Sequence, residues 1–209
     1  MQVDTIQIGT ARPSRGEHFN TTGIFKEQVA SAIVTQSGLV GDTVVDTKNH
    51  GGPDQAVYVY TRDDYEFWEV ELGRPLAGGA FGENLTVSGF TSAGVRTGDR
   101  FVIGGATLEA TVGRIPCRVF QDKMGETGWV KTFREAGRPG VYCRVIGEGA
   151  IVSGNPITYL AAQSDNVTIA ETFELYYDRS AGAARLERAL SSPIAIRLRD
   201  DVERRLEKL

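Results

Sequence analysis

The segment 113–118, Gly-Arg-Ile-Pro-Cys-Arg, contains the side chain with the most reactive chemistry in the sequence. Proline fixes its own φ and favours an extended backbone for the residue before it, so we expect Cys117 to follow a rigid bend at the end of a strand. Arg114 and Arg118 lie three residues before and one residue after this cysteine. Positive neighbours favour the thiolate, which is the form that binds soft metals or attacks electrophiles. The alternative is a buried, inert thiol, and the local sequence supports the two interpretations about equally.

The other cysteine, Cys143, has a different pattern around it. It lies in the run 141–145, Val-Tyr-Cys-Arg-Val, where strand alternation places it on the same face as Val141 and Val145. We expect that face to point into the core, and we therefore interpret Cys143 as structural. Two cysteines make neither a disulfide framework nor a four-cysteine zinc site.

A second group of polar residues surrounds a glycine-rich loop. Asp42 and Asp46 precede the segment 50–57, His-Gly-Gly-Pro-Asp-Gln-Ala-Val. Such a loop makes a sharp turn and exposes backbone amides ahead of an apolar strand, and exposed amides can bind an anion. The alternative is a hairpin loop in which His50 and Asp54 satisfy backbone groups. The residues alone favour this alternative.

Other polar residues allow a site without requiring one. Glu83 and Asn84 stand just before an expected strand, where they can face a cavity or form a turn with a solvated glutamate. Asp99 follows a glycine at the start of another strand, and we interpret it as a turn former. Three basic residues, Lys131, Arg134 and Arg138, could contact a cofactor. A solvated helix face is the favoured interpretation.

The overall charge and several absent motifs exclude common functions. The formal net charge of −4 argues against nucleic acid or an acidic membrane as the main partner. No apolar run approaches the ~18 residues needed to cross a bilayer, and the N-terminus lacks the pattern of a signal peptide. The sequence also lacks dinucleotide, Walker, zinc-protease and serine-hydrolase motifs, and His18 has no second histidine at metal-ligand spacing. We therefore expect a reduced, cytoplasmic, soluble protein without hydrolytic zinc chemistry.

Short apolar runs broken by turn residues dominate the first 160 residues. Runs rich in Val, Ile, Thr and Tyr predict strands. One helix is expected to begin at Thr61 and to end at Gly73, and a second is expected over 127–136. Many short strands with few helices between them favour a barrel or a folded sheet. The predicted strands cover residues 3–8, 41–47, 56–60, 84–87, 100–103, 106–112, 141–146 and 156–160.

The last 44 residues are predicted to form three short amphipathic helices. Thr168 and Glu171 match a capping box, Ser180 is expected to cap the second helix, and Ser192, which is followed by proline, the third. Helices this short are not stable alone and must pack on one another or on the strands. The third carries an apolar stripe at 194, 198, 202, 206 and 209. We therefore predict a mainly β (α+β) fold with a β-barrel domain over residues 1–160 and a three-helix domain over residues 166–209.

In order and spacing, these segments resemble the MOSC domain, and within it the YiiM-like group, which carries a C-terminal three-helix domain. The resemblance covers roughly residues 1–160, and the tail agrees in the number of helices. The His-Gly-Gly-Pro-Asp and Pro-Cys motifs in this order are more specific than either motif alone. The matching positions are 41–42, 46, 50–57, 65, 68, 81–85, 98–101, 114, 116–117, 140 and 144–145.

The resemblance implies a MOSC-type barrel and a molybdenum–molybdopterin cofactor, with no pyridoxal phosphate. In better-studied members, including the mitochondrial amidoxime-reducing component, the cysteine that matches Cys117 is a sulfur ligand to molybdenum. Those proteins reduce amidoximes, hydroxylamines and N-hydroxylated bases. By resemblance, Cys117 is the metal ligand and a catalytic residue. The other implied site residues are His50 and Asp54 in catalysis, and Arg114, Asn84, Gly51 and Gly52 in cofactor binding.

The same resemblance implies the partners. A small N-hydroxylated substrate is expected, and since the sequence shows no flavin or iron–sulfur motif, the electrons are expected from a separate reductase. We expect neither nucleic acid nor a membrane as a partner, while monomer and homodimer both stay open. The chain departs from the YiiM-like pattern at Gly154-Asn155, where the group has Gly-Asp. Asparagine keeps the turn propensity and loses the charge.

Two other functions are compatible with the same residues. Cys117 could carry a persulfide in a sulfur or molybdenum-cofactor carrier protein that has no reductase activity. Alternatively, the thiol is incidental to a non-catalytic binding module. The reductase requires metal and N–O bond reduction, the carrier requires a sulfur adduct on Cys117, and the binding module requires neither.

Overall fold

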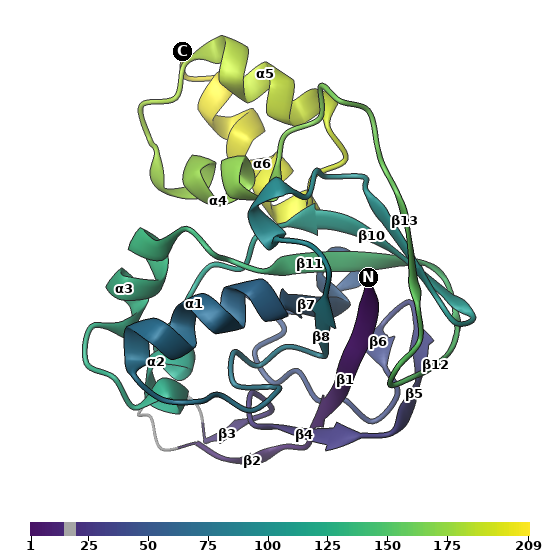
Figure 1. The fold of residues 1–209 in the computed structure, drawn as a ribbon. Helices are drawn as coiled ribbons and strands as arrows, with labels where there is room; N and C mark the ends of the chain where they lie inside the picture. The colour runs from purple at the N-terminus through teal and green to yellow at the C-terminus, as the bar shows by residue number, and fades with distance from the viewer. Residues whose placement is uncertain (15–19) are drawn as a thin grey trace.

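The computed structural model of the chain describes residues 1–14 and 20–209 and shows a mixed α+β fold (Figure 1). His18 lies outside the described residues. The strands are β1 (Gln2–Gly9), β2 (Arg12–Pro13), β3 (Thr21–Thr22), β4 (Lys26–Val29), β5 (Ser31–Thr35), β6 (Gly38–Leu39), β7 (Val57–Thr61), β8 (Leu85–Ser88), β9 (Arg100–Ile103), β10 (Ala106–Val112), β11 (Val141–Gly147), β12 (Gly149–Val152) and β13 (Ile157–Leu160). The helices are η1 (Pro53–Gln55), α1 (Arg62–Leu72), η2 (Ser92–Gly94), α2 (Arg118–Met124), α3 (Trp129–Ala136), α4 (Ile169–Tyr177), α5 (Ala183–Ser191) and α6 (Ile196–Leu206).

The largest sheet has eight strands in the order β13-β9-β10-β11-β7-β8-β1-β4. All neighbours in it are antiparallel except β7 and β8, which are parallel and are connected through helix α1. A second sheet has the order β12-β5-β6, and β2 pairs with β3. The large sheet and the mixed α+β class agree with the sequence-based prediction.

The predicted closed barrel is not found among the described strands. The start of β1 meets the segment before β13 through an isolated bridge between Gln2 and Pro156 and three backbone hydrogen bonds, Val3 N to Asn155 O, Gly154 N to Val3 O and Ile157 N to Met1 O, at 2.8 to 3.1 Å. The reason is that β1 is already paired on both edges, with β8 on one side and with β4 from Ile6 onward on the other. Only the first few residues of β1 remain to meet the strand at the far end of the sheet.

Two apolar clusters hold the fold together. One lies on the inner face of the sheets, where Val141, Cys143 and Val145 of β11 are buried as the alternation predicts. The other is aromatic and joins the sheet to the helices, with the rings of Trp68 and Phe133 stacked 5.8 Å apart. Helices α4 to α6 contribute their buried residues to this second cluster. The tail therefore shares a core with the sheet, and the predicted division into two domains stays a prediction.

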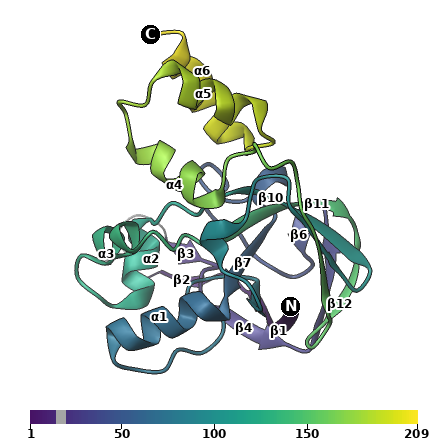
Figure 2. The same ribbon diagram turned by 45° about the horizontal axis from the view of Figure 1, so that its top comes forward.

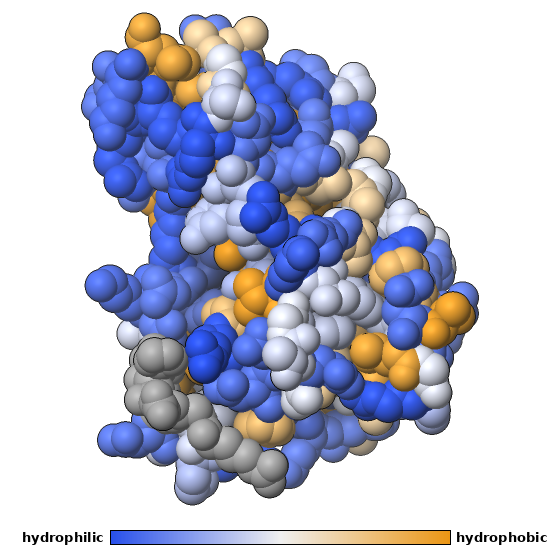
Figure 3. All heavy atoms as spheres, turned by 90° about the vertical axis from the view of Figure 1, so that its left-hand side faces the viewer, coloured by the Kyte–Doolittle hydropathy of each residue, from blue (hydrophilic) through white to orange (hydrophobic). Residues whose placement is uncertain are grey.

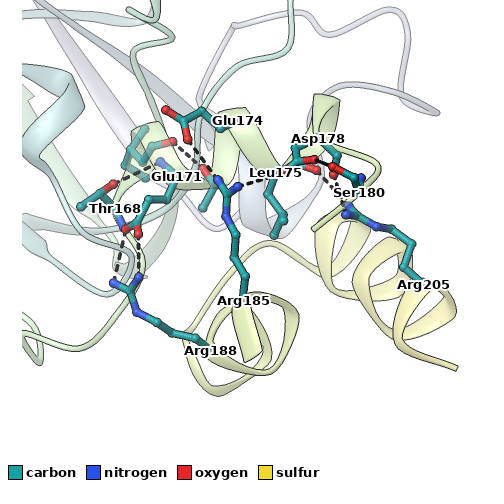
Figure 4. A network of polar contacts seen from close by, with 11 residues as sticks. Thr168, Glu171, Glu174, Leu175, Asp178, Ser180, Arg185, Arg188 and Arg205 are labelled. Atoms are coloured by element: carbon teal, nitrogen blue, oxygen red, sulfur yellow. Dashed lines mark hydrogen bonds and ion pairs between the residues drawn. The ribbon is translucent and has the colours of Figure 1, made fainter. Parts of the chain in front are cut away.

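Helices α4, α5 and α6 stack on the body near β10, as Figures 1 and 2 show from two directions. The predicted capping box is confirmed: Thr168 Oγ1 accepts a hydrogen bond from Glu171 N, and the Glu171 carboxylate accepts one from Thr168 N. Arginines tie the three helices together, since Arg188 bonds Glu171 and Arg205 donates to two carbonyl oxygens near the end of α4 (Figure 4). No helix in the described part of the chain is long and apolar enough to span a membrane.

The two predicted serine caps in the tail are wrong. Helix α5 begins after Gly182 and α6 after Ala195. The hydroxyl of Ser180 instead donates to the side chain of Asp178 (Figure 4). The hydroxyl of Ser192 donates to Arg188 O and accepts from Val167 N. A local contact thus occupies the side chain of Ser180, and a local and a tertiary contact occupy that of Ser192.

Three local predictions fail in the first 160 residues. Residues 41–47 are a loop and not a strand. Short strands between residues 12 and 39, and β12, were not predicted. Three of them hold only two residues, β4 and β12 alternate weakly in burial, and β5 was missed although its burial alternates. Helix α2, directly after Cys117, was also not predicted.

The expected apolar stripe of α6 stops before Leu209, which is 76% exposed.

Replacing Thr168 with alanine should lower the free energy of unfolding by about 1 kcal/mol, because the first amides of α4 lose their side-chain acceptor. The measurement is urea unfolding followed by circular dichroism. Thr132→Ala is the matched control, since Thr132 is exposed in α3 and caps no helix. Equal losses in the two variants would contradict the capping role.

Candidate functional site

Cys117 lies between the end of β10 and the start of α2, in an extended conformation with φ −125° and ψ 172°. Its side chain is partly exposed, whereas Cys143 is fully buried and burial raises the pKa of the Cys143 thiol. The interpretation of Cys143 as structural is confirmed. Cys117 is thus the cysteine that solvent and ligands can reach.

Cys117 opens onto a cavity of about 300 Å³, which we call the sheet-side cavity. Residues from distant parts of the sequence line it, including the loop before β7, the start of β8 and the segment after β10. Five of the seven residues predicted for the site lie on its wall, and Gly52 and Asp54 do not. The five are His50, Gly51, Asn84, Arg114 and Cys117.

Arg114 places a buried positive charge in the wall of the sheet-side cavity, since the residue is only 4% exposed. Its Nη1 donates to the carbonyl oxygen of Phe81 at 2.7 Å, and its guanidinium lies 4.6 Å from the centre of the Phe120 ring. Its Nε is buried and has no hydrogen-bond partner in the structure. Gly82 permits the close approach of this loop, because a Cβ there would lie 3.2 Å from Nη1 in a backbone with φ +74°.

A second buried cation, Lys26, was not predicted. Its Nζ contacts both carboxylate oxygens of Asp42, at 2.5 and 2.7 Å, and both side chains are less than a tenth exposed. Burial lowers the pKa of Lys26, although Asp42 opposes this shift. Asn84 joins the pair by donating to Asp42 at 2.8 Å and accepting from Tyr58 N at 3.0 Å. The partners are too far apart in sequence for spacing to reveal them.

The loop before β7 carries His50 and Gly51 into the cavity. Asp46 begins the loop by accepting hydrogen bonds from the backbone and side-chain amides of Asn49. Gly51 then has φ +67°, which favours glycine. Burial, together with the positive charge of Arg114, lowers the pKa of His50 to about 4. His50 is therefore neutral at physiological pH.

Asp54 lies outside the sheet-side cavity and holds the C-terminal helices instead. Its Oδ1 pairs with Arg144 at 2.9 Å, and its Oδ2 accepts a hydrogen bond from Ile196 N, the first residue of α6, at 2.7 Å. A carboxylate at this end of a helix is favoured by the helix dipole and by the free amides.

Arg197 of α6 makes the reciprocal contact with the same loop. Its guanidinium donates to the carbonyl oxygens of Thr47, Asn49 and Gly51 and to Oε1 of Gln55, at 2.7 to 3.4 Å. One side chain from the tail thus binds four acceptors of the loop that carries His50. Sequence reasoning missed Arg197, because nothing local distinguishes it from the other arginines of the tail.

A second cavity, of about 440 Å³, lies between this loop and helices α4 and α6, and we call it the helix-side cavity. Figure 3 shows the surface indented between the helical tail above and the sheet body below, with apolar atoms in the indentation. The two cavities share six wall residues, Cys117 among them, so they adjoin along this part of the wall. The shared residues are Asp46, Asn49, His50, Gln55, Cys117 and Tyr142.

Comparison with known proteins agrees with this arrangement. A family model described as the MOSC domain matches residues 46–158, which include the His50 loop, Arg114 and Cys117. The chain belongs to the MOSC domain family. The predicted membership of this family is confirmed.

The relatives place the chain in the YiiM-like group. It is 36% identical over 171 residues to the uncharacterized protein YflK of Bacillus subtilis, covering 81% of this chain and 77% of YflK. It is 30% identical over 175 residues to protein YiiM of Escherichia coli, covering 82% of this chain and 78% of YiiM. A Gibberella moniliformis protein named "Reductase" is 30% identical over 146 residues, which are 67% of this chain and 26% of that protein. The crystal structure of YiiM from Geobacillus stearothermophilus superposes with a TM-score of 0.82 at 28% identity, covering 98% of both chains.

Arg197→Ala should loosen the His50 loop without unfolding the tail. Hydrogen bonds to a charged donor contribute about 1.5–3 kcal/mol, so amide hydrogen exchange at Asn49, His50 and Gln55 should speed up by about tenfold or more. Arg205→Ala is the control, because Arg205 lies on the same helix and bonds only groups of the tail. If exchange in the loop speeds up equally in both variants, or in neither, the contacts of Arg197 do not hold the loop in place.

The low pKa of His50 predicts an acid-sensitive stability. The unfolded chain binds this proton near pH 6.5 and the folded protein only near pH 4, so stability is present above pH 6.5 and is lost as the pH falls toward 4. In His50→Gln this loss should be smaller by up to about 3 kcal/mol. Urea unfolding of both proteins between pH 4 and 7.5 measures the difference. Parallel pH profiles would show that His50 titrates normally.

Proposed function

We propose that the protein is a molybdenum-cofactor-dependent oxidoreductase that reduces N-hydroxylated compounds, with Cys117 as the sulfur ligand of the metal. The observation that carries the proposal is the sheet-side cavity, in which a reachable cysteine faces two buried cations, Arg114 and Lys26. Membership of the MOSC family supports the choice of cofactor.

The residues fit an anionic pterin cofactor on three counts. Cys117 supplies a soft thiolate ligand of the kind that molybdenum takes. The buried Nε of Arg114 has no hydrogen-bond partner among residues 1–14 and 20–209, and an unsatisfied charged donor at a cavity wall is costly unless a ligand completes it. Gly51 gives the wall a bare backbone segment beside the sulfur. Arg114 and Lys26 would hold the phosphate and Cys117 the metal.

When bound, the cofactor would accept two electrons and take the oxygen atom from nitrogen. Overall the N–O bond breaks, two electrons and two protons are consumed, and the products are the N–H compound and water. In this proposal a reductase domain or protein supplies the electrons. The relative named "Reductase", about a quarter of which this chain covers, is a precedent for this fold inside a larger protein with that name.

Two neighbouring residues, His50 and Lys123, would contribute hydrogen bonding and positive charge to the site. Neutral His50 can donate or accept a hydrogen bond without adding charge. Lys123 stands behind the cavity wall, where burial lowers its pKa to about 8, and its Nζ donates to the carbonyl oxygen of Ile24 at 2.9 Å. It therefore adds positive potential toward the cofactor side.

The deciding experiment compares wild type with Cys117→Ser, both produced in a host that makes the cofactor. Wild type should contain molybdenum and should reduce benzamidoxime with reduced methyl viologen as electron donor. The serine variant should lose bound molybdenum, and its kcat/KM should fall by at least about a thousandfold, the scale for removing an essential group.

Cys143→Ala is the matched control, since Cys143 is the other cysteine and lies in the core. It should keep the metal and the activity while losing some stability. A metal-free, inactive wild type whose Cys117 carries one extra sulfur atom by mass spectrometry would establish the carrier function instead. Wild type with neither metal nor sulfur adduct would favour a binding module.

A further inference from the structure

The helix-side cavity also reaches Cys117, whereas Lys26 and Asn84 line only the sheet-side cavity. If the sheet-side cavity holds the cofactor, a metal on the sulfur remains accessible from the helix-side cavity alone. The proposed function needs a second compartment for the substrate next to the sulfur. Both compartments are present, and they meet at Cys117.

The wall of the helix-side cavity contains apolar and aromatic side chains, besides the polar side chains of Asp46, Asn49, His50 and Gln55. Val112, Ile115 and Pro116 line it on the chain leading to the cysteine. Tyr142 forms part of the opposite wall and is held in place against Tyr58, with ring centres 4.8 Å apart. Tyr176 of α4 is 41% exposed and also lines the cavity. Apolar walls with aromatic rings suit a flat, unsaturated ligand.

The outer end of the same cavity carries positive charge. Three arginines share the carboxylate of Asp201: Arg179 at 2.8 Å, Arg204 at 3.6 Å and Arg205 at 3.5 Å. Of these, Arg179 and Arg204 line the cavity. Arg179 also lies over the Tyr176 ring, 5.6 Å from its centre. Three guanidinium groups on one carboxylate leave a net positive charge and spare N–H donors. This end therefore suits a carboxylate, phosphate or carbonyl group.

We propose that the helix-side cavity is the substrate subsite, and that it selects flat aromatic N-hydroxylated compounds with an acceptor or anionic group at the end away from the N–OH. The inference rests on the proposed function and deepens it. Tyr176 contacts the aromatic ring, and Arg204 and Arg179 bind the acceptor group. The C-terminal helices thus determine specificity, and the sheet-side residues hold the cofactor.

The test uses three substrates of graded size and charge with the metal-loaded full chain: hydroxylamine, benzamidoxime and 4-carboxybenzamidoxime. Wild type should prefer them in increasing order by kcat/KM. Tyr176→Ala should lower the ratio of kcat/KM for benzamidoxime to kcat/KM for hydroxylamine by at least about tenfold, the scale of a lost aromatic contact. Arg204→Ala should lower the ratio of kcat/KM for 4-carboxybenzamidoxime to kcat/KM for benzamidoxime by about tenfold, the scale of a lost charged hydrogen bond.

Arg74→Ala is the matched control, since Arg74 is exposed just after α1 and lines neither cavity. It should leave both ratios unchanged within twofold. If Tyr176→Ala and Arg204→Ala also leave their ratios unchanged, the subsite assignment is wrong. It is equally wrong if either variant loses molybdenum, because the residue would then act on the cofactor.

A second measurement needs no cofactor and separates this inference from the proposed function. In cofactor-free protein, 4-carboxybenzamidoxime should slow the alkylation of Cys117 by iodoacetamide, followed by peptide mass spectrometry. The protection should weaken about tenfold in Arg204→Ala and not in Arg74→Ala. Protection of Cys117, combined with no N–O reduction by the molybdenum-loaded protein, would refute the proposed reaction but support the binding site. Equal protection in the two variants, or no protection of wild type, would refute the binding site.

Discussion

The buried positive charge of Arg114 is the constraint on which the rest of the site depends. A guanidinium without water must have hydrogen-bond acceptors or aromatic faces around it. The structure supplies the carbonyl oxygen of Phe81 and the ring of Phe120. Glu83, also fully buried, fixes the turn that presents this carbonyl, since its carboxylate accepts hydrogen bonds from Gly79 N and Phe81 N. The glutamate that could have formed a solvated turn is thus part of the support of the site.

The second support is the reciprocal connection between helix α6 and the loop before β7. Asp54 of the loop accepts from the first amide of α6, and Arg197 of α6 binds the carbonyl oxygens of the loop. Each element satisfies polar groups that the other leaves unpaired, as the ends of helices and loops require. The tail is therefore part of the site's architecture, and its helices complete the wall beside Cys117.

Local signals predicted the regular elements well where a single residue type fixes the geometry. Strands β9 and β10 have the predicted bounds, and α1 begins at its threonine cap and ends at Gly73, whose φ is +63°. Prediction failed where other contacts, local or tertiary, outweigh the expected preference. Ser180 and Ser192 were expected to cap helices and bond elsewhere, and residues 41–47 are apolar enough for a strand but form a loop beside the cavity.

The sequence by itself determined which side chains have the required chemistry: one cysteine after a rigid proline, an arginine near it, and a glycine loop with a histidine. Their types and order also identified the family. Only the tertiary structure decided that Lys26 joins Arg114, that Asp54 holds a helix, and that Arg197 holds the loop. The physical reason is that buried and partly buried charges are paired through space, and their partners here lie between 16 and 150 residues apart along the chain. No local pattern records such distances.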